Sequence, residues 1–198
     1  HQFGLEVPNY FAQGQEPDFE APSFRRSNAF AATAREVTAV RTSVGINELQ
    51  NFGKFSVTGT DARAWLNRIM AGRIPKPGRM ALNPMLSPKG RLLGDFTVSC
   101  LSETEFQLTA SYGAQSIHYR WFLNTLSGDV HVKNISDART GFQIAGPRAR
   151  ALLTLCTRAP MDLKFLDVRR MTVGQAACIV QRVSYTGDLG YEIYCDPM

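Results

Sequence analysis

An internal repeat constrains the fold of this 198-residue chain more than any other sequence feature. The segment GKFSVTGTDARAWLNRI (53–69) matches TGFQIAGPRARALLTLC (140–156) at an offset of 87 residues, and the same offset sets EFQL (105–108) over EIYC (192–195). Seven positions carry the same or a similar residue in both copies: Phe55 and Phe142, Val57 and Ile144, Gly59 and Gly146, Ala62 and Ala149, Arg63 and Arg150, Ala64 and Ala151, Leu66 and Leu153. Similarity at a fixed offset indicates duplicated supersecondary units.

Each copy follows the same order of elements. Alternating residues predict a strand, a glycine ends it, and a helix follows, begun by Thr60 or Asp61 in the first copy and by Pro147 in the second. Two further strands come next, 91–101 and 105–111 in the first copy. The sequence therefore predicts an α+β fold of duplicated β-α-β-β units, with antiparallel or mixed sheets and helices packed on one face.

The second copy is shorter than the first. The first continues with an amphipathic helix (114–126) and a strand (130–135), for which the second has no counterpart. We expect residues 51–137 to form a first repeat and 138–198 a truncated second repeat. Its sheet would lack a covering helix and would lean on a partner or a rearranged helix. Residues 1–50, rich in Pro and Phe at first and partly helical later, are interpreted as an extended lead-in from an upstream domain.

Composition excludes several classes of protein. Hydrophobic residues make up 44% and charged residues 20%, as in ordinary globular domains, and no apolar run is long enough to cross a bilayer. The N-terminal residues have no basic start followed by an apolar stretch, so we do not expect them to be a signal peptide. The net charge of +5 comes from scattered residues without a nucleic-acid motif, so we expect no nucleic-acid partner. The four cysteines form no CxxC pair and lie near no histidine, which predicts reduced thiols and no metal site.

The chain resembles a known family over nearly its whole length. The segments PSFRRSNAF, FGKFSVTGTDA, NPMLSPKGRLLGDFTVS, FQIAGPRARALL and VSYTGDLGYEIY are similar to the folate-binding region of dimethylglycine and sarcosine dehydrogenases, which itself resembles the aminomethyltransferase (T-protein) of the glycine cleavage system. Those dehydrogenases join an N-terminal flavin domain to a C-terminal folate domain. Because no GxGxxG motif occurs here, the resemblance implies that FAD is bound only in the full-length protein and not by this segment. The family's C-terminal barrel is absent too.

The resemblance implies capture of a one-carbon unit. The flavin domain oxidises an N-methyl amine to an iminium or formaldehyde, and tetrahydrofolate takes up the carbon as 5,10-methylenetetrahydrofolate. A folate site needs a carboxylate at the pterin edge, another near the nitrogens, and apolar walls. The chain would then be a fragment of a folate-dependent amine dehydrogenase, inactive alone as an oxidoreductase, in the bacterial cytoplasm or the mitochondrial matrix.

Two residues of the last motif match the family's pterin-binding positions. Glu192 corresponds to a glutamate that accepts hydrogen bonds from the pterin ring amide and exocyclic amine. Its alternative is a cross-strand ion pair with Arg182. Tyr185 corresponds to a tyrosine beside the same site, and its alternative is a half-buried strand aromatic.

The catalytic position of the family falls on Asp95, the second residue of the T-protein's acidic pair, which would stabilise charge and handle protons at the folate nitrogens. Its alternative is a strand aspartate facing water. Three positions depart from the family pattern. Gly94 replaces the first acid of the pair, Ser111 replaces an asparagine on the strand after the hairpin, and Leu82 replaces a tyrosine just before the NPMLSPKG turn. Ser111 can still form a hydrogen bond, whereas Leu82 can only pack.

Other functions are compatible with the same scaffold. One is a non-catalytic folate-sensing protein, such as the regulatory subunit of pyruvate dehydrogenase phosphatase, against which Asp95 argues. Another is a folate-dependent iron–sulphur assembly factor, whose signature cysteine is missing from YTGDLGYE (185–192). A general basic interaction domain has no positive feature in its favour. Lys89, Arg79 and Arg91 are all candidates for holding the folate glutamate tail.

Overall fold

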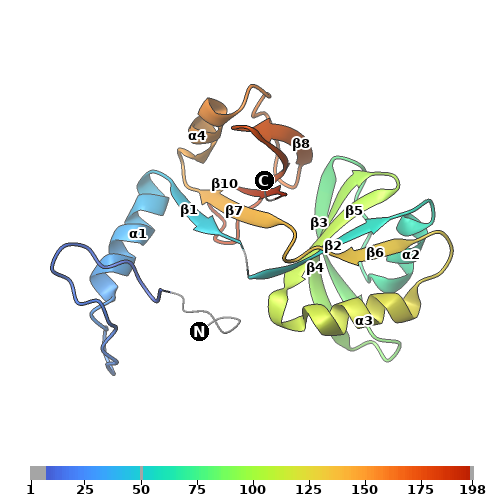
Figure 1. The fold of residues 1–198 in the computed structure, drawn as a ribbon, viewed down its shortest axis with the longest axis horizontal. Helices are drawn as coiled ribbons and strands as arrows, with labels where there is room; N and C mark the ends of the chain where they lie inside the picture. Colours follow the sequence, from blue (N-terminus) through green and yellow to red (C-terminus); the bar gives the residue numbers. More distant parts are fainter. Residues whose placement is uncertain (1–7, 50, 197–198) are drawn as a thin grey trace.

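Two antiparallel sheets of five strands each make up the centre of the molecule (Figure 1), and the expected α+β class is confirmed. The computed structural model describes residues 8–49 and 51–196. In the first sheet the order is β3 (Arg79–Leu86), β4 (Leu92–Ser102), β5 (Glu105–Ser111), β2 (Phe52–Thr58) and β6 (His131–Asn134). In the second sheet it is β8 (Val168–Val173), β9 (Ala176–Gln181), β10 (Gly190–Cys195), β7 (Thr140–Ala145) and β1 (Gly45–Glu48).

The internal repeat is confirmed by the matching order of the strands in the two sheets. Helix α2 (Ala62–Ile69) follows β2, and helix α4 (Ala149–Cys156) follows β7, so both eight-residue helices begin at equivalent positions of the repeat. The strand pairs β3–β4–β5–β2 of the first sheet correspond one by one to β8–β9–β10–β7 of the second.

The glycine that ends the first strand of each copy has a physical reason to recur. Gly59 and Gly146 have φ angles of 129° and 126°, a region that residues with a Cβ rarely adopt. A Cβ on Gly59 would lie 2.0 Å from the Asp129 carbonyl oxygen, and one on Gly146 would lie 2.5 Å from the carbonyl oxygens of Ser43 and Val40. The turn from strand to helix therefore requires glycine in both copies.

The edge next to β7 is formed by a segment that comes before the repeat. In the first sheet β6 pairs with β2, and β1 takes the equivalent place beside β7 in the second sheet. Helix α1 (Phe30–Thr42) leads directly into β1 (Figure 1). The expected lead-in thus contributes a strand to the second sheet, although the division of the chain at residues 50 and 137 stays a proposal.

Each sheet buries one face against helices. Helix α2 and helix α3 (Gln115–Thr125), which follows a short 3-10 turn (Tyr112–Ala114), cover the first sheet through a core that includes Phe55, Trp65 and Phe122. The outer face of the second sheet packs against α4 and the segment 159–165. This chain therefore supplies much of the cover that we expected from a partner, although Ile46 on β1 stays 65% exposed.

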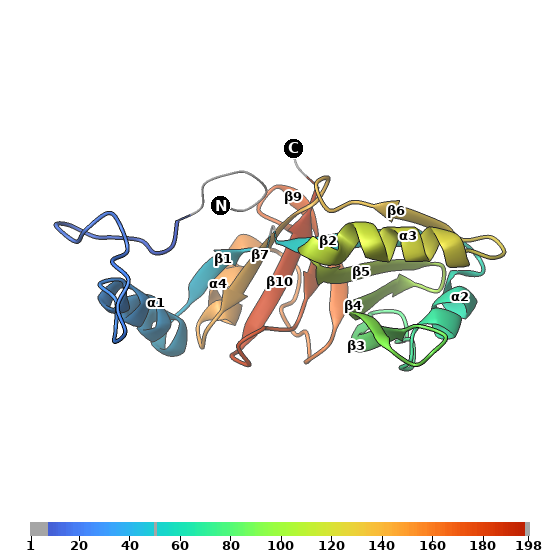
Figure 2. The same cartoon turned by 90° about the horizontal axis from the view of Figure 1, so that it is seen from below.

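The opposite faces of the two sheets meet each other (Figure 2). Tyr194 and Ile179 of the second sheet form one small core with Phe52 and Leu101 of the first. We call these the inner faces. Along each strand every second side chain points to the inner face. Asp95, which lies opposite Pro84, and Glu192, which lies opposite Gln181, both occupy such positions.

Candidate functional site

Three of the predicted site residues share the inner face of the first sheet. Leu82 lies opposite Thr97, which in turn lies opposite Thr109. Asp95 comes two residues before Thr97 and Ser111 two residues after Thr109, so on these antiparallel strands both lie toward the same end of the face. Leu82 is 69% exposed, and both Asp95 and Ser111 are exposed. This end of the inner face therefore presents an apolar, an acidic and a hydroxyl side chain that a ligand can reach.

The position before Asp95 cannot carry a second acid of the kind found in the T-protein. Gly94 points to the opposite, helix-bearing face, where a Cβ would lie 2.4 Å from His118 Nε2 and 2.8 Å from the ring of Phe96. His118 is buried, its ring centroid lies 4.8 Å from that of Phe96, and its Nε2 lies 3.0 Å from the Leu93 carbonyl oxygen. Burial lowers the pKa of His118, so the ring is neutral at pH 7. Asp95 alone faces the site.

Gly94→Asp is expected to lower the free energy of unfolding by about 1–3 kcal/mol, the usual cost of overpacking, because the added carbons collide with His118. Chemical denaturation measures the change. The matched control is Gly113→Asp, where an added Cβ meets nothing within 4 Å. Combining Gly94→Asp with His118→Ala should recover part of the loss; equal destabilisation by Gly94→Asp and Gly113→Asp would contradict the collision.

Glu192 lies on the inner face of the second sheet, in the middle strand β10. Its Oε2 accepts a hydrogen bond of 2.8 Å from the hydroxyl of Tyr194, which is only 1% exposed. Burial raises the pKa of the Glu192 carboxyl above its usual value of 4.5, and the Tyr194 hydrogen bond opposes that shift. Tyr194 fixes one carboxylate oxygen and leaves Oε1 for another donor.

The ion pair considered as the alternative role of Glu192 is not formed. Glu192 lies directly opposite Gln181 and Gln143, so Arg182 falls outside its row. The Arg182 guanidinium instead donates a hydrogen bond of 3.2 Å to the Gly190 carbonyl oxygen and lies 5.4 Å from the centroid of the Tyr191 ring. The carboxylate of Glu192 is therefore free of a basic partner in its own row.

Two glutamines flank Glu192, and sequence reasoning missed both. Gln181 Nε2 donates to Ser99 Oγ of the first sheet at 2.9 Å, while its Oε1 is buried without a hydrogen bond to the described residues. Gln143 Nε2 is likewise buried without a partner in this part of the chain. The sequence around them gives no signal of a site, because the residues two positions away on the same strands, Gly141, Ala145 and Ile179, are not polar.

The structure places Tyr185 on the loop between β9 and β10, outside the strands that flank Glu192. Residues 182–189 form a loop rather than continuing the two strands, because β9 ends at Gln181 and β10 begins at Gly190. Tyr185 on this loop is 88% exposed. Its neighbour Thr186 lines a cavity of about 430 Å³ together with Gln143 and Asn47 on the inner face. The loop thus reaches the site through Thr186 in this conformation.

The structure distinguishes among the basic residues that are candidates for holding a folate glutamate tail. Arg79 forms an ion pair with Asp167, the residue before β8, so its charge is already engaged. Lys89 and Arg91 lie on the exposed turn between β3 and β4, six and four residues from Asp95. A further cation, Lys54, is fully buried beside this face, and its Nζ donates to the Phe52 and Ser136 carbonyl oxygens at 3.1 and 3.4 Å.

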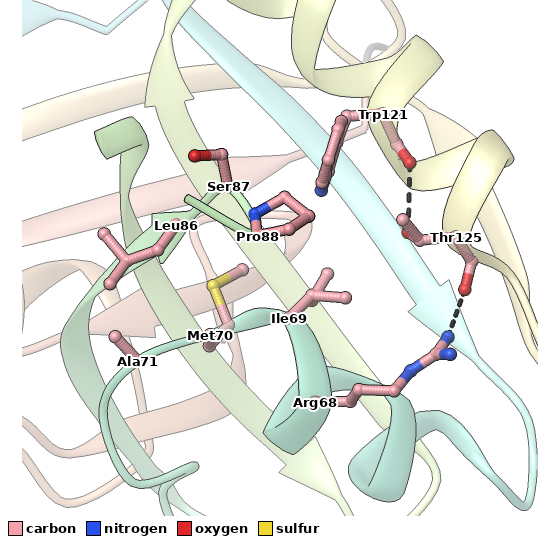
Figure 3. A pocket seen from close by; sticks show the side chains of 9 residues that line it. All are labelled: Arg68, Ile69, Met70, Ala71, Leu86, Ser87, Pro88, Trp121 and Thr125. Atoms are coloured by element: carbon pink, nitrogen blue, oxygen red, sulfur yellow. Dashed lines mark hydrogen bonds between the residues drawn. The ribbon is translucent and has the colours of Figure 1, made fainter. Parts of the chain in front are cut away.

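A second cavity, of about 370 Å³, lies on the other side of the first sheet between α2, α3 and the β3–β4 turn (Figure 3). Figure 3 shows Trp121 and Pro88 on one side of it and Met70 and Ile69 on the other. None of the five predicted site residues lines it. Among the described residues, no cluster of three or more His, Cys, Asp or Glu side chains could hold a metal ion, and no described helix is long and apolar enough to span a membrane.

Comparison with known proteins gives one family match and several relatives. The model of the GCVT N-terminal domain matches residues 1–198. Dimethylglycine dehydrogenase, mitochondrial, of Homo sapiens is 36% identical over 198 residues, which cover 96% of this chain and 23% of that protein. The aminomethyltransferase of Bacillus subtilis (strain 168) is 29% identical over 170 residues, which cover 84% of this chain and 47% of that protein. The chain thus spans about a quarter to a half of the length of these relatives.

Two solved structures share the fold. The aminomethyltransferase T of the glycine cleavage system from Bartonella henselae superposes with a TM-score of 0.75 at 21% identity, over 82% of this chain and 45% of that chain. A chain of the heterotetrameric sarcosine oxidase from Corynebacterium sp. U-96 superposes with a TM-score of 0.59 at 18% identity, over 87% of both chains. The expected T-protein-like fold is confirmed.

Proposed function

Because the chain belongs to the GCVT N-terminal domain family, we propose that it binds tetrahydrofolate and accepts a one-carbon unit on it. It is an aminomethyltransferase-like domain related to dimethylglycine dehydrogenase. In this proposal the one-carbon donor is an iminium, or formaldehyde, derived from an N-methyl amine such as dimethylglycine or sarcosine. The product is 5,10-methylenetetrahydrofolate.

Glu192 is the observation that carries the proposal. A partly buried carboxylate with one oxygen held by Tyr194 and no basic partner in its row can accept donors from outside the row. The pterin ring supplies two adjacent donors, the N3–H and the exocyclic amine, which a carboxylate binds in a bidentate manner. An apolar groove would favour many planar ligands, whereas this arrangement favours one with two donors on one edge.

Asp95 is assigned to the nitrogens of the bound folate. One nitrogen attacks the iminium carbon, a C–N bond forms, and the nitrogen becomes positively charged. The Asp95 carboxylate stabilises that charge, takes up the proton and returns it to the demethylated amine, whose C–N bond to the one-carbon unit then breaks. The second nitrogen attacks the same carbon, closes the ring and releases its own proton to solvent. No oxidation state changes in these steps. Leu82 and Ser111 line the same face and bind the body of the ligand.

The remaining elements of the proposal follow the relatives. An upstream flavin domain binds FAD and oxidises the amine, whereas this segment binds none. The place of action is the mitochondrial matrix or the bacterial cytoplasm, in line with the name of the human relative and the bacterial origin of the aminomethyltransferase. Lys89 and Arg91 are the candidates for the glutamate tail.

Affinity for tetrahydrofolate is expected to fall on acidification at a higher pH than an ordinary glutamate would cause. Glu192 accepts the pterin donors only when ionised, and because burial raises its pKa, protonation begins at a higher pH than for an ordinary glutamate as the pH is lowered. Below that pKa the affinity should fall about tenfold for each pH unit. Isothermal titration from about pH 4.5 to 8 measures it.

The control for this pH dependence is Glu192→Gln, which cannot titrate. Any acid-dependent loss that remains in the variant belongs to the ligand or to other groups and is subtracted. An equally steep pH dependence in the variant and in the unaltered protein would contradict the assignment of Glu192.

A further inference from the structure

Gln143 is a buried polar side chain for which the one-carbon chemistry gives no role. It lies directly opposite Glu192 on one side and Asn47 on the other. It is only 8% exposed, and its amide nitrogen makes no hydrogen bond to the described residues. A buried amide donor without a partner is unfavourable, so native proteins rarely keep one without a reason.

The Gln143 side chain borders a cavity, although its amide nitrogen is itself enclosed. Gln143 and Asn47 line this cavity of about 430 Å³ together with residues of α1, and the next row across the strands consists of small residues: Gly45, Ala145 and Gly190. Val40 of α1 lies against Gly45 and Ser184 of the loop 182–189 lies against Gly190, so a planar ligand approaches the Gln143 amide from the cavity side rather than across these small residues.

The three central residues of the row offer an ordered set of hydrogen-bonding groups. On β9, Gln181 gives its Nε2 to Ser99, which leaves Oε1 as an acceptor. On β10, Glu192 offers a carboxylate, and on β7, Gln143 offers an N–H donor. Across the sheet the order is thus acceptor, carboxylate, donor.

A 4-oxo pterin carries the complementary edge. Its exocyclic amine and its N3–H are donors, and its 4-oxo oxygen beside them is an acceptor. We propose that Gln143 donates a hydrogen bond to the 4-oxo oxygen and so selects 4-oxo pterins over 4-aminopteridines. This inference rests on the proposed function, because it requires the pterin edge to lie at Glu192.

The discrimination follows from what each ligand presents to the same amide. A 4-amino group offers an N–H toward the Gln143 N–H, so the two donors face each other and neither is satisfied. Sites built to bond a substrate group reject analogues that lack it, because the buried protein group is left unpaired. Gln143 is therefore a specificity residue that leaves the reacting nitrogens untouched.

The test compares the affinities of tetrahydrofolate and its 4-amino-4-deoxy analogue by isothermal titration. The unaltered protein should favour tetrahydrofolate by tenfold or more, as one hydrogen bond to a buried group implies. In Gln143→Met, which keeps the volume but has no donor, affinity for tetrahydrofolate should fall about tenfold and the preference should vanish. In Gln143→Glu, whose carboxylate accepts from the 4-amino group, the preference should reverse.

Gln107→Met is the matched control. Gln107 is also buried, on the inner face of the first sheet, its Nε2 likewise lacks a partner among the described residues, and it lies outside the Glu192 row. Its substitution should leave the ratio of the two affinities unchanged. If Gln143→Met does not fold, the predicted reversal of the preference in Gln143→Glu tests the role of Gln143.

Two failures can be told apart. Absence of tetrahydrofolate binding by the unaltered protein overturns the proposed function, and this inference with it. Binding with the same preference in the unaltered protein, Gln143→Met and Gln143→Glu overturns the role of Gln143 alone.

Discussion

Replacing Asp95 with asparagine is expected to slow formation of methylenetetrahydrofolate about 10²- to 10⁴-fold, the range over which a positioned acid or base contributes. The side chain keeps its shape but can neither take up the proton nor balance the charge on the attacking nitrogen. Asp95 is exposed on the inner face and pairs in register with Pro84, so the substitution disturbs no core contact. Methylenetetrahydrofolate formation coupled to amine oxidation in the full-length protein measures the rate.

The rate loss is separated from a binding loss by two further measurements. Affinity for tetrahydrofolate should change less than about threefold in Asp95→Asn, since the pterin edge is held elsewhere. Asp95→Glu keeps the charge and should restore part of the rate. An unchanged rate in Asp95→Asn would contradict the catalytic assignment of Asp95, whereas tetrahydrofolate binding without any measurable rate in the unaltered protein would support a folate-sensing protein on the same scaffold.

Replacing Glu192 with alanine is expected to weaken tetrahydrofolate binding by about 100-fold or more. Each hydrogen bond to a charged group is worth about 1.5–3 kcal/mol, and the proposed pterin contact has two. Tyr194 would also lose its buried acceptor, which adds to the cost. Isothermal titration of tetrahydrofolate at pH 7 measures the change.

Tyr194→Phe provides the graded comparison for this loss. It keeps the carboxylate but removes the hydroxyl that fixes Oε2, so the affinity should fall about tenfold or less. Circular dichroism and the thermal midpoint show whether each variant is folded. Wild-type affinity in a folded Glu192→Ala variant would eliminate the pterin assignment.

Local patterns predicted much of the fold. The match of GKFSVTGTDARAWLNRI with TGFQIAGPRARALLTLC predicted both helices and their preceding strands, because the glycine at the turn and the apolar face of the helix are set by adjacent residues. The turn at Ser102–Thr104 was predicted for the same reason. Pairing between distant segments was not: nothing local to GINE (45–48) indicates that it joins β7 almost a hundred residues later.

The site was predicted in part. The family resemblance singled out Asp95 and Glu192, and alternation along the strands then sets both on inner faces. The local sequence did not indicate that the loop 182–189 leaves Tyr185 exposed, since its residues suit a strand as well as a loop. Nor did it indicate that His118 fills the space beside Gly94, because that contact joins a strand to a helix more than twenty residues away.

In the proposed complex one folate molecule lies along the two inner faces, with its pterin edge at Glu192 and its reacting nitrogens at Asp95. A crystal structure with bound tetrahydrofolate tests it most directly. We expect the N3–H and the exocyclic amine within hydrogen-bonding distance of the Glu192 carboxylate. The 4-oxo oxygen should accept a hydrogen bond from Gln143, and the reacting nitrogens should face Asp95. Folate bound instead in the cavity between α2 and α3 (Figure 3), or with its pterin ring away from Glu192, would contradict it.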